Sequence, residues 1–134
     1  MKQAVVGDVT LVEEEPGIVT IDYGTAIATA ELVQDVVERS QEEWGEERIA
    51  VLVKAKSATD LAKIGAVLSK HDLASFTIAS AILTPGKLTQ LIGNLFMQFQ
   101  NSPFPQRQFV EVEEARAWLR VQVTNDQSES RVAN

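Results

Sequence analysis

Cysteine is absent from this chain of 134 residues, and histidine occurs once, as His71. A chain without thiols forms no disulfide, offers no thiolate nucleophile and builds no cysteine metal site. A single histidine makes a poor metal site, and no serine or cysteine nucleophile accompanies His71 in a recognisable catalytic arrangement. We therefore expect no metal, no other cofactor and no enzymatic activity.

Positive charge is also scarce. Lysine and arginine number 12, against 19 aspartates and glutamates, which gives a net charge of −7. Proteins that bind nucleic acids gain much of their affinity from cationic side chains that displace counterions from the phosphate backbone, so we expect no nucleic-acid partner. An anionic membrane surface is disfavoured for the same reason.

Long apolar runs are missing as well. No segment is long enough to cross a bilayer, and the start of the chain lacks the apolar stretch and the small-residue cleavage site of a signal peptide. We therefore expect a cytoplasmic protein that does not insert into a membrane. The glycines are scattered without the spacing of phosphate-binding loops such as GxGxxG, which excludes nucleotide binding by those motifs.

What the sequence does contain is an alternation of short apolar segments with one-sided helical patterns. Its hydrophobic content of 45% suits one domain with one core, which we place at residues 1–124. The polar residues 125–134 lack an apolar period and predict a disordered tail. The alternation favours an α/β fold with helices packed on a mixed β-sheet, in the order β-β-α-β-α-β-α-β-α. The expected strands are 9–13, 17–23, 49–53, 73–83 and 107–110, and the expected helices are 29–44, 57–72, 85–100 and 111–123.

Local signals support several of these boundaries. Pro16 followed by Gly17 suits the tight turn of a β-hairpin, because proline presets φ and glycine accepts positive φ. Thr29 is a plausible N-cap, and Gly45 ends the first helix. The run Glu13-Glu14-Glu15 reads as solvated charge.

The C-terminal third carries the most specific pattern, LIGNLFMQFQNSPFPQRQFVEVEEARAWL. Its Gly-Asn-Leu-Phe step, its proline-bounded loop around Phe104, its Arg-x-Phe strand and its Ala-x-Ala-Trp-Leu helix resemble the bacterial SpoIIAA-like (STAS-type) domains, in particular their small single-domain branch of uncharacterised function. The match of element order spans residues 9–123. The resemblance implies a SpoIIAA-like mixed sheet and a regulatory role.

STAS-type domains are typified by anti-sigma-factor antagonists, in which a partner kinase phosphorylates a serine at the start of the helix after the central strand. By this resemblance the corresponding position is the turn from Lys54 to Thr59, with Ser57 as the nearest hydroxyl and Thr59 as the second. The antagonists show an Asp-Ser-Ser-Gly-like sequence there, whereas this chain reads Lys-Ala-Lys-Ser-Ala-Thr.

Two interpretations of Ser57 stay open. Ser57-Ala58-Thr59-Asp60 fits a capping box, which would explain the serine by helix stability alone. Alternatively, Lys54, Lys56, Ser57 and Thr59 form an anion site or a phosphoacceptor site, because a helix N-terminus and two cations favour a phosphate.

The function that we expect is a non-enzymatic regulatory or protein-interaction module with a protein partner, switched around Ser57. The alternative is a small-ligand module for a lipid or a nucleotide, with its pocket between the 85–100 helix and the sheet. The apolar side chains there could also form a partner groove or a homodimer surface. The residues of this expected groove are Leu95, Phe96, Met97, Phe99 and Phe104.

Overall fold

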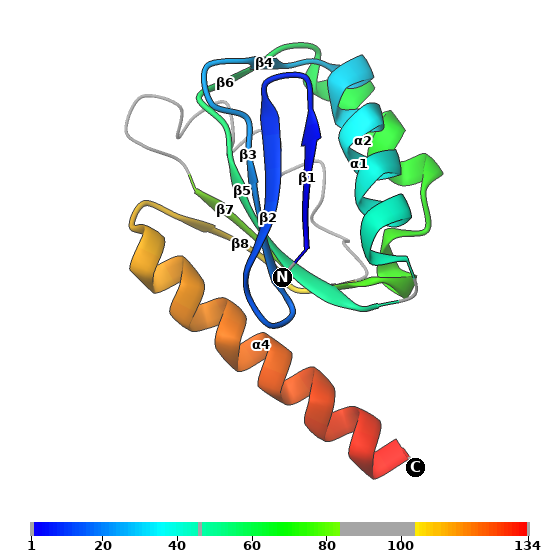
Figure 1. Ribbon diagram of the computed structural model, residues 1–134, viewed down its shortest axis with the longest axis vertical. Coiled ribbons are helices and arrows are strands. Elements are labelled where there is room, and N and C mark those ends of the chain that lie inside the picture. Colours follow the sequence, from blue (N-terminus) through cyan, green and yellow to red (C-terminus); the bar gives the residue numbers. More distant parts are fainter. Residues whose placement is uncertain (1, 46, 84–103, 134) are drawn as a thin grey trace.

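The computed structural model describes residues 2–45, 47–83 and 104–133. Its centre is a six-stranded sheet (Figure 1). The strands, in their order across the sheet, are β1 (Gln3–Val6), β2 (Val9–Glu15), β3 (Ile18–Asp22), β5 (Ile49–Lys54), β7 (Thr77–Leu83) and β8 (Gln106–Phe109). The first three pair antiparallel, and β3, β5, β7 and β8 pair parallel. The prediction of an α/β fold with a mixed sheet is confirmed.

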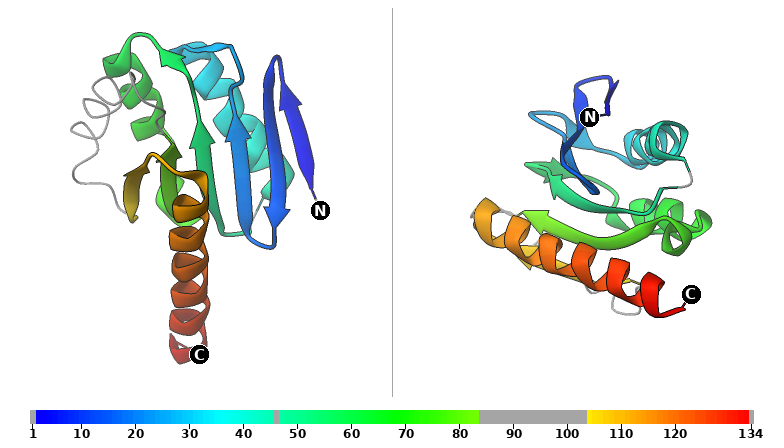
Figure 2. Two further views of the ribbon diagram at one scale, coloured as in Figure 1. Left: turned by 90° about the vertical axis from the view of Figure 1, so that its left-hand side faces the viewer. Right: turned by 60° about the horizontal axis from the view of Figure 1, so that its bottom comes forward.

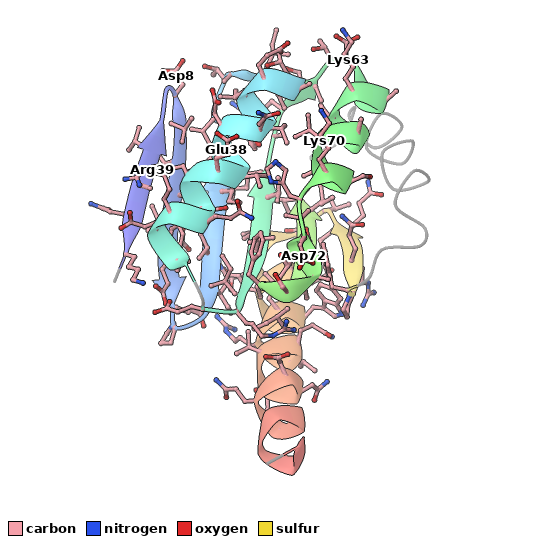
Figure 3. All side chains as sticks on the ribbon, turned by 90° about the vertical axis from the view of Figure 1, so that its right-hand side faces the viewer. Asp8, Glu38, Arg39, Lys63, Lys70 and Asp72 are labelled. Carbon is pink, nitrogen blue, oxygen red and sulfur yellow. The ribbon has the colours of Figure 1, made fainter. Side chains whose placement is uncertain are left out.

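Helices cover both faces of this sheet. α1 (Ala30–Trp44) and α2 (Leu61–Lys70) lie side by side on one face, and α4 (Val112–Ala133) crosses the other (Figures 2 and 3). A short 3-10 helix, η1 (Leu73–Ser75), leads into β7. Each parallel pair from β3 to β7 is thus joined through a helix, as parallel strands require.

Alternation along the strands divides their side chains between two apolar cores. On β5, Ile49 faces the core beneath α1 and α2, whereas Ala50 and Leu52 face α4. The first core also contains Trp44, which is 2% exposed, and the second contains Leu119, which is fully buried. Because β5 is buried on both faces, its sequence is apolar throughout rather than alternating.

The first helix and the hairpin match their sequence signals. The hydroxyl of Thr29 accepts a hydrogen bond from the Leu32 N–H at 3.2 Å, which makes Thr29 the N-cap of α1. Gly45 follows the helix with a φ of 53°, a conformation that favours glycine. Strands β2 and β3 form the expected hairpin, whose turn holds Gly17 at a φ of 81°.

Two other expectations change, and a third is not tested. Strand β1 was not predicted, although Ala4 packs in the first core. The expected helix 57–72 begins only at Leu61, because Ser57–Ala58 form a short strand, β6, that pairs with β4 (Ile27–Ala28). The expected helix 85–100 lies outside the described residues.

The prediction of a disordered tail from Asn125 is wrong for the part that the structure describes. Helix α4 continues to Ala133 and extends beyond the ends of the strands (Figures 1 and 2). Arg48 holds this extension, since its guanidinium donates to Asp126 from two nitrogens, at 2.9 and 3.2 Å. Residues 125–133 contain no proline or glycine, the two residues that most disfavour a helix interior. The helix can therefore continue through this segment although the segment has no apolar face.

The three consecutive glutamates at the end of β2 are not simply solvated charge. The carboxylate of Glu13 accepts hydrogen bonds from the Gly17 N–H and from Nε1 of Trp44, both at 3.1 Å. Burial works against the charged form, but these two hydrogen bonds and the Lys2 ammonium prevail and lower the pKa of Glu13. Glu13 therefore ties the hairpin turn to the last residue of α1.

Glu14 and Glu15 hold the opposite layer. A β-bulge between Glu13 and Glu15 shifts the register of the hairpin, so that alternation is broken at this point. Glu14 pairs with Arg116 at 2.6 Å, and Glu15 pairs with Arg120 through two nitrogens at 2.8 and 2.9 Å. Both arginines belong to α4, so successive glutamates connect to helices on opposite faces of the sheet.

Replacing Glu13 by glutamine tests this connection. The folded pKa of Glu13 lies below its ordinary 4.5, so its contribution to stability is present at neutral pH and is lost as the pH falls through the folded pKa. We expect Glu13→Gln to lower the free energy of unfolding by about 1 kcal/mol at pH 7, because a charged acceptor is replaced by a neutral one. Below about pH 4 the Glu13 carboxylate becomes protonated, so the difference in unfolding free energy between the variant and the wild type becomes smaller. Urea unfolding at a series of pH values measures both effects.

Asp35→Asn is the matched control, since it removes a carboxylate that is exposed on α1 and has no hydrogen bond to the described residues. Its unfolding free energy should stay within about 0.5 kcal/mol of the wild type at each pH. Equal effects of the two substitutions would contradict the assigned role of Glu13.

Candidate functional site

The carboxyl ends of the parallel strands meet at one end of the sheet, where open α/β sheets commonly bind ligands. Here the chain leaves β3 and β5 and forms a two-stranded ribbon of β4 and β6, which lies across this end (Figure 1). Ile27 pairs with Ser57, and Ala28 pairs with Ala58. The Thr59 N–H extends the ribbon by donating to the Ala28 carbonyl at 3.1 Å.

Ser57 is not the N-cap of α2, so the prediction of a capping box is wrong. Its backbone is extended because it pairs with Ile27, and the helix starts four positions later, at Leu61. The N-cap is Asp60, which has a φ of 52° and makes no side-chain capping hydrogen bond. Ser57 is half-buried, and its hydroxyl makes no hydrogen bond to the described part of the chain.

The two predicted lysines and Thr59 fall into different environments. Lys56, which directly precedes β6 in the sequence, and Thr59, which directly follows it, are both exposed. Lys54 is half-buried, and alternation along β5 places it with Ala50 and Leu52 on the face that α4 crosses. Helix α2 packs on the other face, so Lys54 does not join Lys56 at the start of that helix.

The ribbon displays one apolar side chain to solvent. Ile27 is 51% exposed, although its backbone is held by pairing with β6. We use the name ribbon surface for four residues that lie in the ribbon or directly next to it: Ile27, Lys56, Ser57 and Thr59. It combines an apolar side chain, a cation and two hydroxyls within a few residues. Sequence periodicity could not reveal it, because each strand of the ribbon is only two residues long.

Tyr23 supports the ribbon from below. It is 5% exposed and packs in the same core as Ala28. Its N–H donates to the Lys54 carbonyl at 2.9 Å, and its own carbonyl accepts from the Ala26 N–H. Burial raises the pKa of its phenol far above the ordinary value, so the side chain stays neutral at physiological pH. Tyr23 is thus a structural residue and not an acid or base of the site.

The expected groove is described only at one residue. Leu95, Phe96, Met97 and Phe99 lie outside the described residues, and Phe104 is half-buried just before β8. Beyond it, the Phe109 ring contacts Trp118 with a centroid separation of 5.6 Å. The Arg107 guanidinium lies over the Phe109 ring, 5.0 Å from its centroid. This cluster fixes the start of α4 against β8.

Within residues 2–45, 47–83 and 104–133, no three histidine, aspartate or glutamate side chains lie close enough together to hold a metal ion. None of the helices described combines the length and the apolar character that crossing a bilayer requires.

Two alanine substitutions test whether Thr29 caps a helix and Ser57 does not. We expect Thr29→Ala to lower the free energy of unfolding by about 1 kcal/mol, because the Leu32 N–H loses its acceptor. Ser57→Ala should change it by less than about 0.5 kcal/mol, since no helix bond is lost. Urea unfolding of both variants measures the difference. A loss at Ser57 as large as the loss at Thr29 would restore the capping role.

Comparison with known proteins identifies the family. No curated protein and no solved structure matches the chain significantly. A family model described as a domain of unknown function, DUF7793, matches residues 12–122, which runs from β2 into α4 and includes the whole ribbon surface. Its description does not mention STAS-type domains, so the SpoIIAA-like resemblance stays a prediction. The chain belongs to the DUF7793 family.

Proposed function

We propose that this domain is a non-enzymatic protein-interaction module whose partner binds the ribbon surface. The observation that carries the proposal is the exposure of Ile27 in a backbone-paired ribbon, where it pairs with Ser57 and where Lys56 and Thr59 flank the partner strand. A scattered exposed isoleucine would need no explanation. This one stands at the end of the sheet where α/β domains place their binding residues, and its backbone is already ordered.

Order before binding matters for affinity. A partner that docks on a paired segment does not have to fix the backbone of that segment, so less conformational entropy is lost on association. The Thr59 N–H bonds to the Ala28 carbonyl within the ribbon, and the Tyr23 N–H bonds to the Lys54 carbonyl where the chain leaves β3 and β5, so both ends of the ribbon start from fixed backbone. The partner chemistry that fits is an apolar side chain for Ile27 and a carboxylate for Lys56.

A phosphate on the ribbon surface would regulate such an interaction. Of the two hydroxyls, Thr59 is exposed and Ser57 is half-buried between its neighbours. A kinase reaches an exposed hydroxyl without opening the ribbon, so the proposal places the modification on Thr59. The added charge of about −2 would stand close to Lys56 and would compete with an acidic partner for it.

The interaction is tested by comparing two lysine substitutions at similar exposure. Ile27→Lys places a charge in the ribbon surface, and Val121→Lys does so on α4, where Val121 is 55% exposed. The wild-type chain and each variant serve as separate baits in extract of the native host, and the wild type defines the specific partner. We expect Ile27→Lys to bind this partner at least tenfold more weakly than the wild type does, a loss of about 1.4 kcal/mol. Val121→Lys should capture it as the wild type does. Quantitative mass spectrometry reads the ratio.

Loss of the partner with Val121→Lys and not with Ile27→Lys would place the interface on α4 and overturn the proposal. The same samples report the modification. Tandem mass spectrometry of the chain purified from its host, with and without phosphatase, should locate any phosphate on Thr59. A phosphate on Ser57 instead would show that the ribbon opens, and an unmodified chain under every growth condition would remove the switch.

A further inference from the structure

Strand β1 forms the outer edge of the sheet and leaves part of its backbone without a partner strand. It pairs with β2 on one side and is the last strand in the sheet order, so no described strand pairs with its other side (Figures 1 and 2). Such an edge presents N–H and C=O groups that can pair with another chain.

The register shows which groups these are. The Glu13 N–H donates to the Lys2 carbonyl at 3.0 Å, so Lys2 and Glu13 form a hydrogen-bonded pair at the start of the ladder. Bonded and non-bonded pairs alternate along an antiparallel ladder. Ala4 and Val6 therefore bond to β2, whereas Gln3 and Val5 direct their N–H and C=O groups away from it.

Proteins usually protect an exposed edge with a charged side chain, a proline or a bulge within the strand. From Gln3 to Val6 this strand carries none of them. Val5 is 63% exposed, the highest exposure among the large apolar side chains that the structure describes as exposed. Its neighbours on the same face, Gln3, Thr10 and Val12, are uncharged.

We propose that a second copy of this chain binds here, with the two β1 strands antiparallel about a two-fold axis at Ala4. In that register Gln3 of each copy lies opposite Val5 of the other, and both are residues with outward-pointing groups. All of these groups are then paired. If the axis passed through Gln3, Val5 would lie opposite residue 1 of the other copy, and if it passed through Val5, Gln3 would lie opposite residue 7. Neither of these residues belongs to β1, so only the register centred on Ala4 pairs all the outward-pointing groups within the two strands.

Charge does not oppose this register at the contact itself. Each chain carries a net charge of −7, so association through a charged face would be repulsive. The paired strands bring no charge together, because Lys2 of each copy lies opposite Val6 of the other and the two ammonium groups stand at opposite ends of the interface. The sheet then continues from one copy into the next, and both copies keep α1 on the same face.

Val5→Pro tests the backbone pairing. Proline lacks the N–H group, and the Val5 N–H does not serve β2, so the substitution removes an intermolecular bond and leaves the hairpin ladder intact. Sedimentation equilibrium from about 1 μM to about 1 mM should show a dimer for the wild type and for Val5→Thr, which keeps the N–H. Val5→Pro should dimerise at least tenfold more weakly. A wild type that is monomeric throughout this range overturns the proposal and leaves the edge to a different chain.

A pair of double variants tests the register without proline. Gln3→Lys/Val5→Lys sets like charges opposite each other across the axis, and Gln3→Lys/Val5→Glu sets opposite charges there. We expect the first to dimerise at least tenfold more weakly than the second at low salt. Equal dimerisation of the two variants would exclude the register centred on Ala4.

Hydrogen exchange gives a further readout on the unaltered chain. The amides of Gln3 and Val5 should exchange fast in dilute solution and become protected at concentrations where the dimer forms, whereas the amides of Ala4 and Val6 should be protected at both. Protection of all these amides that does not depend on concentration would contradict the pairing.

Discussion

The end of the β2–β3 hairpin is the point on which the layered structure depends. Three successive glutamates there reach in different directions: Glu13 to Trp44 on one face, and Glu14 and Glu15 to the arginines of α4 on the other. Ordinary alternation would send Glu14 away from both neighbours, but the β-bulge changes the register and lets Glu14 and Glu15 serve the same helix. One turn of chain thus connects both helical layers to the sheet.

The parallel strands impose a second constraint, which concerns the site. Their carboxyl ends lie at one end of the sheet, but the two faces of each strand look into different layers. Lys54 therefore belongs to the α4 side although it is close in sequence to Lys56 and Ser57. Proximity along the chain did not gather these side chains, and the ribbon surface is built from residues about thirty positions apart, which pair as β4 and β6.

Sequence periodicity predicted the elements whose signals are local. The spacing of apolar residues and the Thr29 cap located α1, the Pro16-Gly17 turn located the hairpin, and the apolar run from Ile49 located β5. The site was only partly predictable. Ser57-x-x-Asp60 is a good local cap signal, but the pairing of Ser57 with Ile27 is a tertiary contact that holds the segment extended, and no local pattern reports it.

The same reason explains the other differences. The residues of β1 are few, and their assignment as a strand depends on β2 lying beside them. The polar end of α4 carries no apolar stripe, and the tertiary contact that it makes comes from Arg48, a residue of a distant segment, which donates to Asp126 and also to the Ala74 carbonyl. Solvated charge and a structural ion pair look alike in a sequence, as the three glutamates show.

The two layers consequently differ in how they respond to dissolved electrolyte. Trp44 and the side chains around it attach α1 mainly through apolar burial, together with one part-buried hydrogen bond to Glu13. The contacts of α4 with Glu14, Glu15 and Arg48 are partly open to water, where mobile ions weaken attraction between charges. Raising the ionic strength should therefore weaken the attachment of α4 more than that of α1. The C-terminal end of α4, which Arg48 contacts, is the segment most sensitive to salt.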